Sequence, residues 1–195
     1  MSEFPFPNEE ALLTGLRAND PAAYEQLIEQ YADRVYRIAY RLLQNPHDAE
    51  DAMQEAFLTV YLRIADFQGH ASLSSWLYRV VTNKALDMLR KRQRKTEAAT
   101  DALEDLGEDA AEMLPDEHAV LPEDWLERRE TNALIQEGLQ TLSPTLRAAF
   151  VLFEMEDLSM EEVAAALDIS PSAAKVRVHR ARRALREVLR AHLTL

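Results

Sequence analysis

Residues 159–192 read SMEEVAAALDISPSAAKVRVHRARRALREVLRAH, and this stretch decides the fold. A short segment with helical apolar spacing, 160–167, follows Ser159, and Glu162 completes a Ser-x-x-Glu capping box. Only the three residues Asp168, Ile169 and Ser170 separate this segment from a long helix that begins at Pro171. Two helices joined by so short a turn are typical of a helix-turn-helix, which places its second helix in the major groove of DNA.

The second helix of this pair is strongly basic. Residues 172–190 contain seven Lys or Arg side chains and a single acid, Glu187. A helix fits the major groove, where arginines can reach guanine edges or phosphates. A basic surface helix without a partner is the alternative, but the charge and the turn spacing agree on DNA. The helical spacing predicts an inner stripe of Val178, Ala181, Leu185 and Leu189, and an outward or flanking set of Ser172, Lys175, Val176, His179, Arg180 and Arg183.

Proline marks the starts of other helices. Four prolines follow a residue that can cap a helix, in the pairs Asp20-Pro21, Asn45-Pro46, Ser143-Pro144 and Ser170-Pro171. No strand and no internal repeat are evident. The fold class is therefore all-α, with helices predicted near residues 9–18, 21–44, 47–65, 72–92, 125–141, 144–156, 160–167 and 171–192.

The composition excludes several kinds of site. The chain has 195 residues, 47% of them hydrophobic and only four of them glycine, and it contains no cysteine. Disulfides, thiolate metal sites and cysteine nucleophiles are thus impossible, and the five histidines stand too far apart to form a metal cluster. We expect no metal and no cofactor. Neither a signal peptide nor a membrane span is evident, so a cytoplasmic location is expected.

The negative charge of the chain is concentrated in one segment. The net charge is −12, yet residues 96–127 alone hold twelve acids and no base, while the flanking parts are nearly neutral. This segment also contains Gly107, Pro115 and Pro122 and shows no sustained apolar period, which is typical of a solvated linker. The sequence predicts two small helical domains: a tail over 1–8, a first domain over 9–95, an acidic linker over 96–124 and a second domain over 125–195.

The helix near 47–65 has two different faces. One stripe, from Ala49 to Ile64, is apolar at three- and four-residue steps and must be buried. The opposite face carries acids near the helix start and leucines further on: Asp48, Asp51, Gln54, Glu55, Leu58 and Leu62. This face is either a solvated surface whose acids suit a helix N-terminus, or a docking surface for a basic helical partner. A metal site is the weaker alternative, because no further ligand is placed to complete it.

The next helix leads into a basic cluster. Five of the six residues from Arg90 to Lys95 are basic, which favours contact with phosphates over a simple charge-dipole role. Upstream, FQGHASLSS at 67–75 forms a short loop that either holds an unstacked base or is a turn with Ser as an N-cap. The spacing predicts a buried face with Leu73, Leu77, Val80, Val81 and Met88, and an exposed face with Ser75, Arg79, Thr82, Asn83, Leu86 and Arg90.

Three strings, DAEDAMQEAFLTVY, FQGHASLSSWLYRVVTNKALDMLRKR and LSMEEVAAALDISPSAAKVRVHRARRAL, occur in the order and spacing of a known family. The chain resembles an extracytoplasmic-function (ECF) sigma factor, a compact specificity subunit of bacterial RNA polymerase, over residues 9–95 and 125–192. The resemblance implies that the chain has no catalytic site of its own, that it binds core polymerase and promoter DNA, and that an anti-sigma factor restrains it.

The resemblance assigns a role to each predicted surface. It implies that Asp48, Asp51, Gln54, Glu55, Leu58 and Leu62 dock on the β′ clamp of the polymerase. It implies that the single non-template strand of the minus-ten element is read and opened by Gln68, Gly69, His70, Ser72, Ser74, Arg79, Asn83, Arg90, Lys91, Arg92 and Arg94. It implies that the minus-thirty-five duplex is bound by Ser172, Ala173, Lys175, Val176, Arg177, His179, Arg180 and Arg183, beside the β flap.

Two features leave questions open. Relatives usually begin the recognition helix with Gly-Thr-Val-Lys-Ser-Arg, whereas residues 172–177 here read SAAKVR. Direct hydrogen bonding is therefore reduced, and the expected readout relies on thymine-methyl contacts of Ala173 and Val176, on phosphates and on groove shape. The linker either occupies a nucleic-acid route in the polymerase, or masks the basic domains, or is only a tether. A helix-turn-helix repressor or activator that works without polymerase is the alternative function, but it leaves the 47–65 helix and the basic face of the 72–92 helix without a role.

Overall fold

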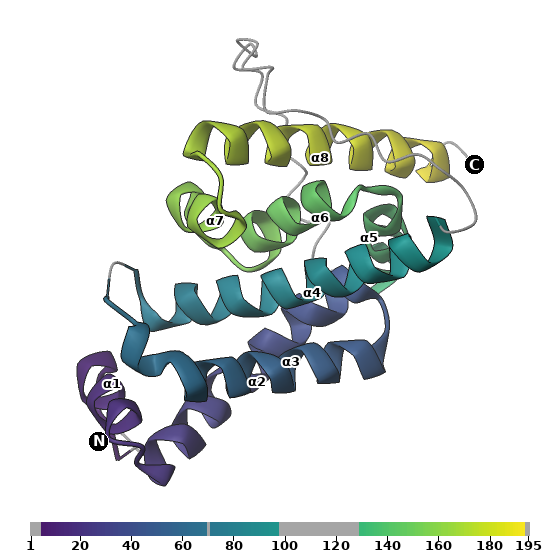
Figure 1. The fold of residues 1–195 in the computed structure, drawn as a ribbon. Coiled ribbons are helices and arrows are strands. Elements are labelled where there is room, and N and C mark those ends of the chain that lie inside the picture. The colour runs from purple at the N-terminus through teal and green to yellow at the C-terminus, as the bar shows by residue number, and fades with distance from the viewer. Residues whose placement is uncertain (1–4, 70, 98–128, 194–195) are drawn as a thin grey trace. The chain divides into compact units, whose positions relative to one another are not determined.

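The computed structural model describes residues 5–69, 71–97 and 129–193 of the 195-residue chain. Throughout these ranges the regular structure is helical, and no strand occurs in them, which confirms the predicted all-α class (Figure 1). The elements are α1 (Glu9–Arg17), α2 (Pro21–Leu43), α3 (Pro46–Arg63), the 3₁₀ turn η1 (Ile64–Asp66), α4 (Leu73–Glu97), α5 (Arg129–Thr141), α6 (Pro144–Phe150), the π-helical turn η3 (Val151–Met155), α7 (Met160–Leu167) and α8 (Pro171–Leu193).

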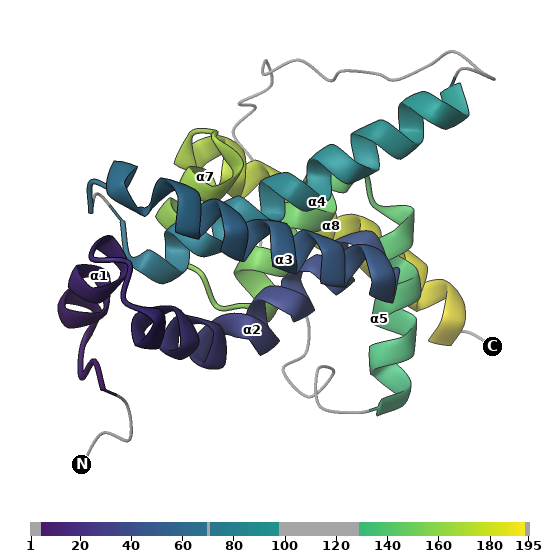
Figure 2. The ribbon, with the colours of Figure 1, turned by 60° about the horizontal axis from the view of Figure 1, so that its bottom comes forward.

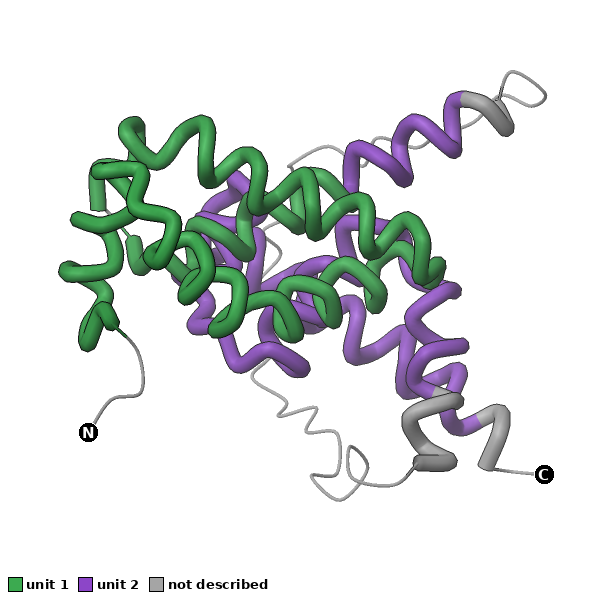
Figure 3. The backbone as a smooth tube through the Cα atoms, turned by 90° about the horizontal axis from the view of Figure 1, so that it is seen from below, with its two compact units in different colours: residues 1–85 green, residues 86–195 purple. Residues whose placement is uncertain are grey.

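The chain divides into two compact units, Met1–Ala85 and Leu86–Leu195, which Figure 3 draws in different colours. The division falls within α4, whereas the sequence places the end of the first domain at residue 95. Most of the predicted acidic linker, residues 98–124, lies outside the described residues.

The first unit is built around α2 and α3, which pack along each other, with α1 packed on α2 (Figures 1 and 2). Its core consists of apolar side chains at helical spacing, among them Leu16, Leu27, Ile38, Val60 and Leu77, each almost fully buried. The predicted inner stripe of α3 is confirmed at Ala49, Ala52, Ala56, Val60 and Ile64, while Met53 and Phe57 are half-buried.

In the second unit α8 packs against α5, α6 and α7. The predicted inner stripe of α8 is confirmed, because Val178, Ala181, Leu185 and Leu189 are all buried. Gly138 of α5 allows the close approach of this stripe, since an added Cβ would lie only 2.7 Å from Cδ2 of Leu185. Phe150 and Leu152 are among the other buried side chains of this unit.

Most of the predicted helix caps are present. Asp20 accepts from the Ala22 amide at 2.9 Å, Asn45 from the Asp48 amide at 3.1 Å, and Ser159 forms the full capping box with Glu162. The prediction at Ser143 is wrong in its chemistry, because no side-chain cap bond forms there. The Ser143 hydroxyl instead lies 3.4 Å from that of Thr145, and only the backbone carbonyl of Ser143 accepts a helical bond, from Arg147.

The exposed face of α4 is narrower than predicted. Ser75, Thr82 and Leu86 were expected to face solvent, but they are 5%, 0% and 6% exposed. Together with Tyr78 and Ala85, which are also buried, they form a second buried stripe beside the predicted one. A helix covered on two sides leaves only a thin exposed arc, and here the arc carries Arg79, Asn83, Asp87 and Arg90.

The predicted helix over 144–156 is interrupted. It is α-helical to Phe150 and continues as the π-helical turn η3, after which Glu156 is buried and Asp157 has a positive φ of 53°. The amide of Leu158 then returns to the carbonyl of Leu152 at 3.1 Å. A π turn adds a residue to the helical repeat, which local periodicity does not reveal.

Candidate polymerase- and nucleic-acid-binding surfaces

The exposed face of α3 carries most of the residues predicted to dock on the polymerase. Asp51, Gln54, Glu55, Leu58 and Leu62 are all exposed, and we call these five residues the α3 face. The two leucines are 55% and 68% exposed, which is unusual for large apolar side chains. Asp48, which was predicted with them, is half-buried at the helix start. Exposed leucines beside carboxylates can bury apolar surface and attract positive charge at the same time.

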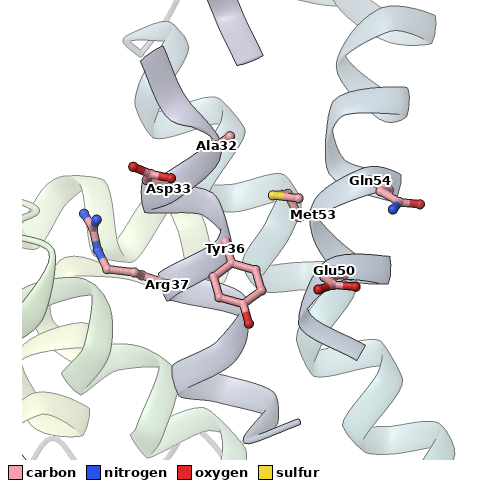
Figure 4. Close-up of a pocket in the computed structure, with 7 residues that line it drawn as sticks. All are labelled: Ala32, Asp33, Tyr36, Arg37, Glu50, Met53 and Gln54. Atoms are coloured by element: carbon pink, nitrogen blue, oxygen red, sulfur yellow. The ribbon is translucent and has the colours of Figure 1, made fainter. Parts of the chain in front are cut away.

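A groove of about 450 Å³ lies between α2 and α3 and is continuous with the α3 face through Gln54. Figure 4 shows that α2 supplies one side of the groove and α3 the other. The lining residues are Ala32, Asp33, Tyr36, Arg37, Glu50, Met53 and Gln54. Sequence reasoning missed Asp33, Tyr36 and Glu50, because the pairing of α2 with α3 is a long-range contact; the only local signal is that these polar residues fall outside the apolar stripes.

Further apolar surface adjoins the α3 face. Tyr61 of α3 is 51% exposed and Ile28 of α2 is 47% exposed. The ring of Tyr61 packs on that of Tyr24 with 5.1 Å between the centroids, so the two helices join in one aromatic patch. Desolvation and the neighbouring Tyr61 raise the pKa of Tyr24.

An ion pair links the α3 face to α4. The Lys84 ammonium lies 2.5 Å from a carboxylate oxygen of Glu55, and the two side chains are 38% and 57% exposed. At such exposure the pair contributes little to stability. The pair shows that a predicted polymerase contact lies next to the helix of the predicted minus-ten surface.

The loop before α4 contains Gln68 and Gly69, both exposed, while His70 lies outside the described residues. Gly69 has φ +75°, and no heavy atom lies within 4 Å of a Cβ added there. Ser72 acts as the N-cap of α4, since its hydroxyl accepts from the Ser75 amide at 3.1 Å and lies 2.9 Å from that of Ser74. The structure thus supports the turn-and-cap interpretation for Ser72, and its contact with a base stays a prediction.

The exposed arc of α4 is rich in cations. Arg79, Asn83, Arg90, Lys91, Arg92 and Arg94 are all exposed, as predicted. Arg90 pairs with Asp87 at 3.0 Å, one turn earlier. Trp76 is half-buried and packs on Phe67 with 5.2 Å between the ring centroids. A row of guanidinium groups on one helix is suited to hold the backbone of a nucleic-acid strand.

The helix-turn-helix is present with the predicted turn. Asp168 ends α7 in the left-handed conformation with φ 56°, and Ser170 caps α8 by accepting from the Ala173 amide at 3.2 Å. Among the predicted contacts, Ser172, Lys175, Arg180 and Arg183 are exposed, and Ala173, Val176, Arg177 and His179 are half-buried. Ala174 faces the core. The four exposed residues recur at three- to five-residue steps and so form one continuous basic face, which we call the α8 face.

Two arginines that the sequence did not single out are structural. Arg182 of α8 donates from Nε to a carboxylate oxygen of Glu154 at 2.6 Å and lies over the ring of Phe153, which ties α8 to η3. Arg147 is 8% exposed and donates to the carbonyls of Gln140 and Leu142 at the end of α5. Burial lowers the pKa of Arg147, and its Nη2 donors are satisfied by the two carbonyls.

Other kinds of site are not found in the part of the chain that the structure describes. No three or more His, Asp or Glu side chains there are grouped so that they could hold a metal ion. None of the described helices is both long enough and apolar enough to cross a membrane.

Two parts of the chain match family definitions. Residues 27–95 match Sigma-70 region 2, and residues 132–185 match Sigma-70, region 4. The first match contains α3, the loop and most of α4, and the second contains α7 and the α8 face. All three candidate surfaces therefore fall largely inside regions that the family defines.

Individual relatives support these matches. The chain is 40% identical over 179 residues to the ECF RNA polymerase sigma factor SigE of Mycolicibacterium smegmatis; the match covers 92% of this chain and spans 66% of that protein's length. It is 36% identical over 177 residues to the ECF RNA polymerase sigma factor SigW of Bacillus subtilis, covering 90% of this chain and 93% of SigW. The fold is similar to the sigma factor RpoE of Bartonella quintana, solved in complex with the anti-sigma factor NepR, with a TM-score of 0.62 at 23% identity over 86% of this chain and 96% of that one.

The similarity to SigW extends over nearly the whole of both chains, and the two matched regions occur in the same chain. The all-α fold and the helix-turn-helix agree with that similarity. The chain belongs to the family of extracytoplasmic-function RNA polymerase sigma factors.

Proposed function

We propose that this chain binds core RNA polymerase through the α3 face, opens the minus-ten element with α4 and its preceding loop, and binds the minus-thirty-five element with the α8 face. The observation that carries this proposal is the presence of three different surfaces on one small chain. One surface combines leucines with carboxylates, and two separate helices present rows of cations. A DNA-binding regulator that acts alone needs only one of the three.

The α3 face suits a basic helical partner. Leu58 and Leu62 offer apolar area to bury, and Asp51 and Glu55 attract positive charge. The groove between α2 and α3 adds Asp33 and Glu50, which extends the acidic surface onto a second helix. We assign this combined surface to the β′ clamp of the polymerase.

We assign the two basic helices to different forms of DNA, a duplex and a separated strand. The α8 face follows a helix-turn-helix, a motif suited to the major groove of a duplex. The exposed arc of α4 lies beside a loop with Gly69 at a positive φ, an arrangement that suits the backbone of a separated strand and an unstacked base. We assign Arg79, Asn83 and the cluster Arg90–Arg94 to the non-template strand.

The rest of the predicted organisation belongs to the same proposal. We assign residues 1–8 to a tail, 9–95 to the polymerase-binding and minus-ten domain, 96–124 to an acidic linker and 125–195 to the minus-thirty-five domain. The chain acts in the cytoplasm, catalyses no reaction itself and uses no cofactor. An anti-sigma factor is a further proposed partner, because a structural relative was solved with one.

Transcription with purified components tests the proposal. The full chain is mixed with core polymerase, isolated by gel filtration, and assayed on promoters selected from a randomised library. We expect co-elution, specific transcripts, and permanganate reactivity of thymines in the minus-ten region only when both components are present. Tight duplex binding by the chain alone, without any affinity for core polymerase, would instead identify a stand-alone regulator.

A further inference from the structure

Both ends of the loop between η1 and α4 are hydrogen-bonded to α1. Nη2 of Arg17 donates to the carbonyl of Phe67 at 2.8 Å, and the amide of Leu73 donates to Oε1 of Glu9 at 3.0 Å. These contacts join residues that are 50 and 64 positions apart in the sequence. The two α1 residues thus reach the last residue before the loop and the first residue of the next helix.

Each bond satisfies a group that the local structure leaves without a partner. Leu73 is the first residue of α4, where a helix cannot bond its own amides, and the Ser72 hydroxyl is already used by the Ser75 amide. The Glu9 carboxylate accepts a hydrogen bond from the Leu73 amide, and it places negative charge at the positive, N-terminal end of the α4 dipole. The Arg17 guanidinium gives the Phe67 carbonyl a charged donor. Charge-assisted bonds of this kind are roughly twice as strong as neutral ones.

The position of α1 is set independently of the loop. Gln26 of α2 is 3% exposed and bonds both backbone groups of Phe6, at 2.9 and 2.7 Å, just before α1 begins. The Tyr24 hydroxyl donates to the Leu16 carbonyl at 3.1 Å. Gly15 lets α1 approach closely, because an added Cβ would lie 2.8 Å from that of Ala23. α1 is therefore fastened to α2, the same helix that lines the polymerase-facing groove.

Glu9 and Arg17 lie at opposite ends of α1. Eight residues of α-helix at 1.5 Å per residue separate them by about 12 Å, and a helix does not stretch. A rigid helix with one charged side chain at each end fixes the separation of the two loop ends, whatever the loop itself does. Such preorganisation lowers the free-energy cost of presenting a recognition loop in its working conformation.

We propose that Glu9 and Arg17 are positioning residues for promoter opening, through which α1 holds the two ends of the 67–73 loop in a fixed relation to α2 and α3. The inference rests on the proposed function, because it concerns how the minus-ten surface is held. Neither residue needs to touch DNA. The surface that binds polymerase and the loop that reads the promoter are then parts of one rigid frame.

The test compares Glu9→Gln and Arg17→Met with the wild type in the reconstituted transcription system. Glu10→Gln is the matched control, since Glu10 is an exposed acid in the same first turn of α1. Open-complex formation should fall about tenfold in each loop-end variant, the effect of one charged hydrogen bond, while affinity for core polymerase stays within twofold. Arg17→Lys should recover part of the loss, because an ammonium can still donate to the Phe67 carbonyl.

A second readout separates positioning from general stability. Opening rates are measured on a series of promoters with single substitutions in the minus-ten element. We expect the loop-end variants to discriminate less between these promoters than the wild type does, and amide exchange at Leu73 to be faster in Glu9→Gln. An equal loss on every promoter, together with a lower melting temperature, means a structural role only and overturns the inference.

The remaining outcomes are also decisive. If the wild type opens promoters and both variants open and discriminate as it does, the inference fails while the proposed function stands. If the wild type does not direct initiation at all, the proposed function fails and this inference falls with it.

Discussion

Among the described residues of the loop before α4, Gly69 is the one with a positive φ. Its φ of +75° lies in the left-handed region, and no heavy atom lies within 4 Å of an added Cβ. Alanine would therefore meet no clash and only backbone strain, which for an L-residue in this region is roughly 1–2 kcal/mol. We expect Gly69→Ala to lower promoter opening and to reduce the free energy of unfolding by about 1 kcal/mol, measured by permanganate reactivity and urea denaturation.

Gly69→Asn is the control for this prediction, because asparagine tolerates the left-handed region better than alanine does. It should retain more promoter opening than the alanine variant. Equal losses in the two variants would mean that the side chain itself, and not backbone strain, disturbs the loop.

Leu62 is the most exposed large apolar residue among the described residues, at 68%. Because Leu62 is exposed in the free chain, replacing it by a polar residue changes the stability of the free chain little. In a complex that buries Leu62, the same replacement removes the free energy that its burial contributes. We expect Leu62→Gln to weaken binding to core polymerase at least tenfold, from the roughly 1.5–3 kcal/mol that a buried leucine contributes. Its unfolding free energy should change by no more than about 0.5 kcal/mol.

Binding is measured by fluorescence titration of labelled chain with core polymerase. Arg63→Gln is the neighbouring control, because Arg63 is also exposed and pairs only at the surface with Asp66, at 3.5 Å. Unchanged affinity in Leu62→Gln would remove this leucine from the docking surface.

At the scale of helices, the caps of α6 and α7 form a natural comparison. Ser159 makes a complete capping box, whereas Ser143 occupies the same position before α6 without a side-chain cap bond. We expect Ser159→Ala to reduce the free energy of unfolding by about 1 kcal/mol and Ser143→Ala to leave it nearly unchanged. Thermal unfolding of both variants checks this, and equal effects would contradict it.

Two substitutions in α8 should have different effects, one on the affinity for DNA and its salt dependence, and the other on sequence preference. Lys175→Ala removes an exposed cation, so we expect weaker binding to the minus-thirty-five duplex and a salt dependence whose slope is lower by about 1. Val176→Ala removes only apolar surface that can meet a thymine methyl, so it should alter sequence preference and keep the salt slope. Fluorescence anisotropy of the holoenzyme on duplex probes at several salt concentrations distinguishes the two, and identical salt slopes for Lys175→Ala and wild type would exclude a phosphate contact.

Helix boundaries were predictable because their signals are local. Asp20-Pro21 and Asn45-Pro46 begin α2 and α3 at the predicted residues, and apolar spacing identified the inner stripe of α8. The second buried stripe of α4 was not predictable, since small and polar residues such as Ser75 and Thr82 are buried there by their neighbours in space. The missing cap bond at Ser143 has a local origin instead, because its position fits a cap but its hydroxyl lies near that of Thr145, two residues on.

The candidate site, too, has features that could be predicted from the sequence and features that could not. Residues on one helix, such as Leu58 and Leu62 of α3 or Lys175 and Arg180 of α8, could be placed on exposed faces from spacing alone. Contacts between distant segments could not: the groove needs the pairing of α2 with α3, and the Arg17 contact to Phe67 spans 50 residues. Periodicity describes one helix at a time and contains no information on which helix lies next to it.

At the level of the whole chain, the uneven distribution of charge should affect DNA binding. Residues 96–127 hold all of the excess in the net charge of −12. Replacing their acids with Asn and Gln at constant length removes a long-range repulsion, so we expect the free chain to bind duplex DNA more tightly at low salt. The difference should vanish near 1 M salt, where the Debye length is about 3 Å. Filter binding measures the affinity for DNA at both salt concentrations. Equal binding of the wild type and the variant at low salt would show that the acids of residues 96–127 do not repel DNA.

The pairing of Glu55 with Lys84 has a consequence for the order of events at a promoter. In the proposed complex, a positively charged group of the polymerase near Glu55 would attract the same carboxylate and weaken its pairing with Lys84. Lys84 directly precedes or follows no other cation, but it lies beside Asn83, which we assign to the non-template strand, so its ammonium would then add to the positive charge that faces DNA. Because the pair is exposed, this gain is small, and binding to the polymerase and binding to DNA would reinforce each other only weakly.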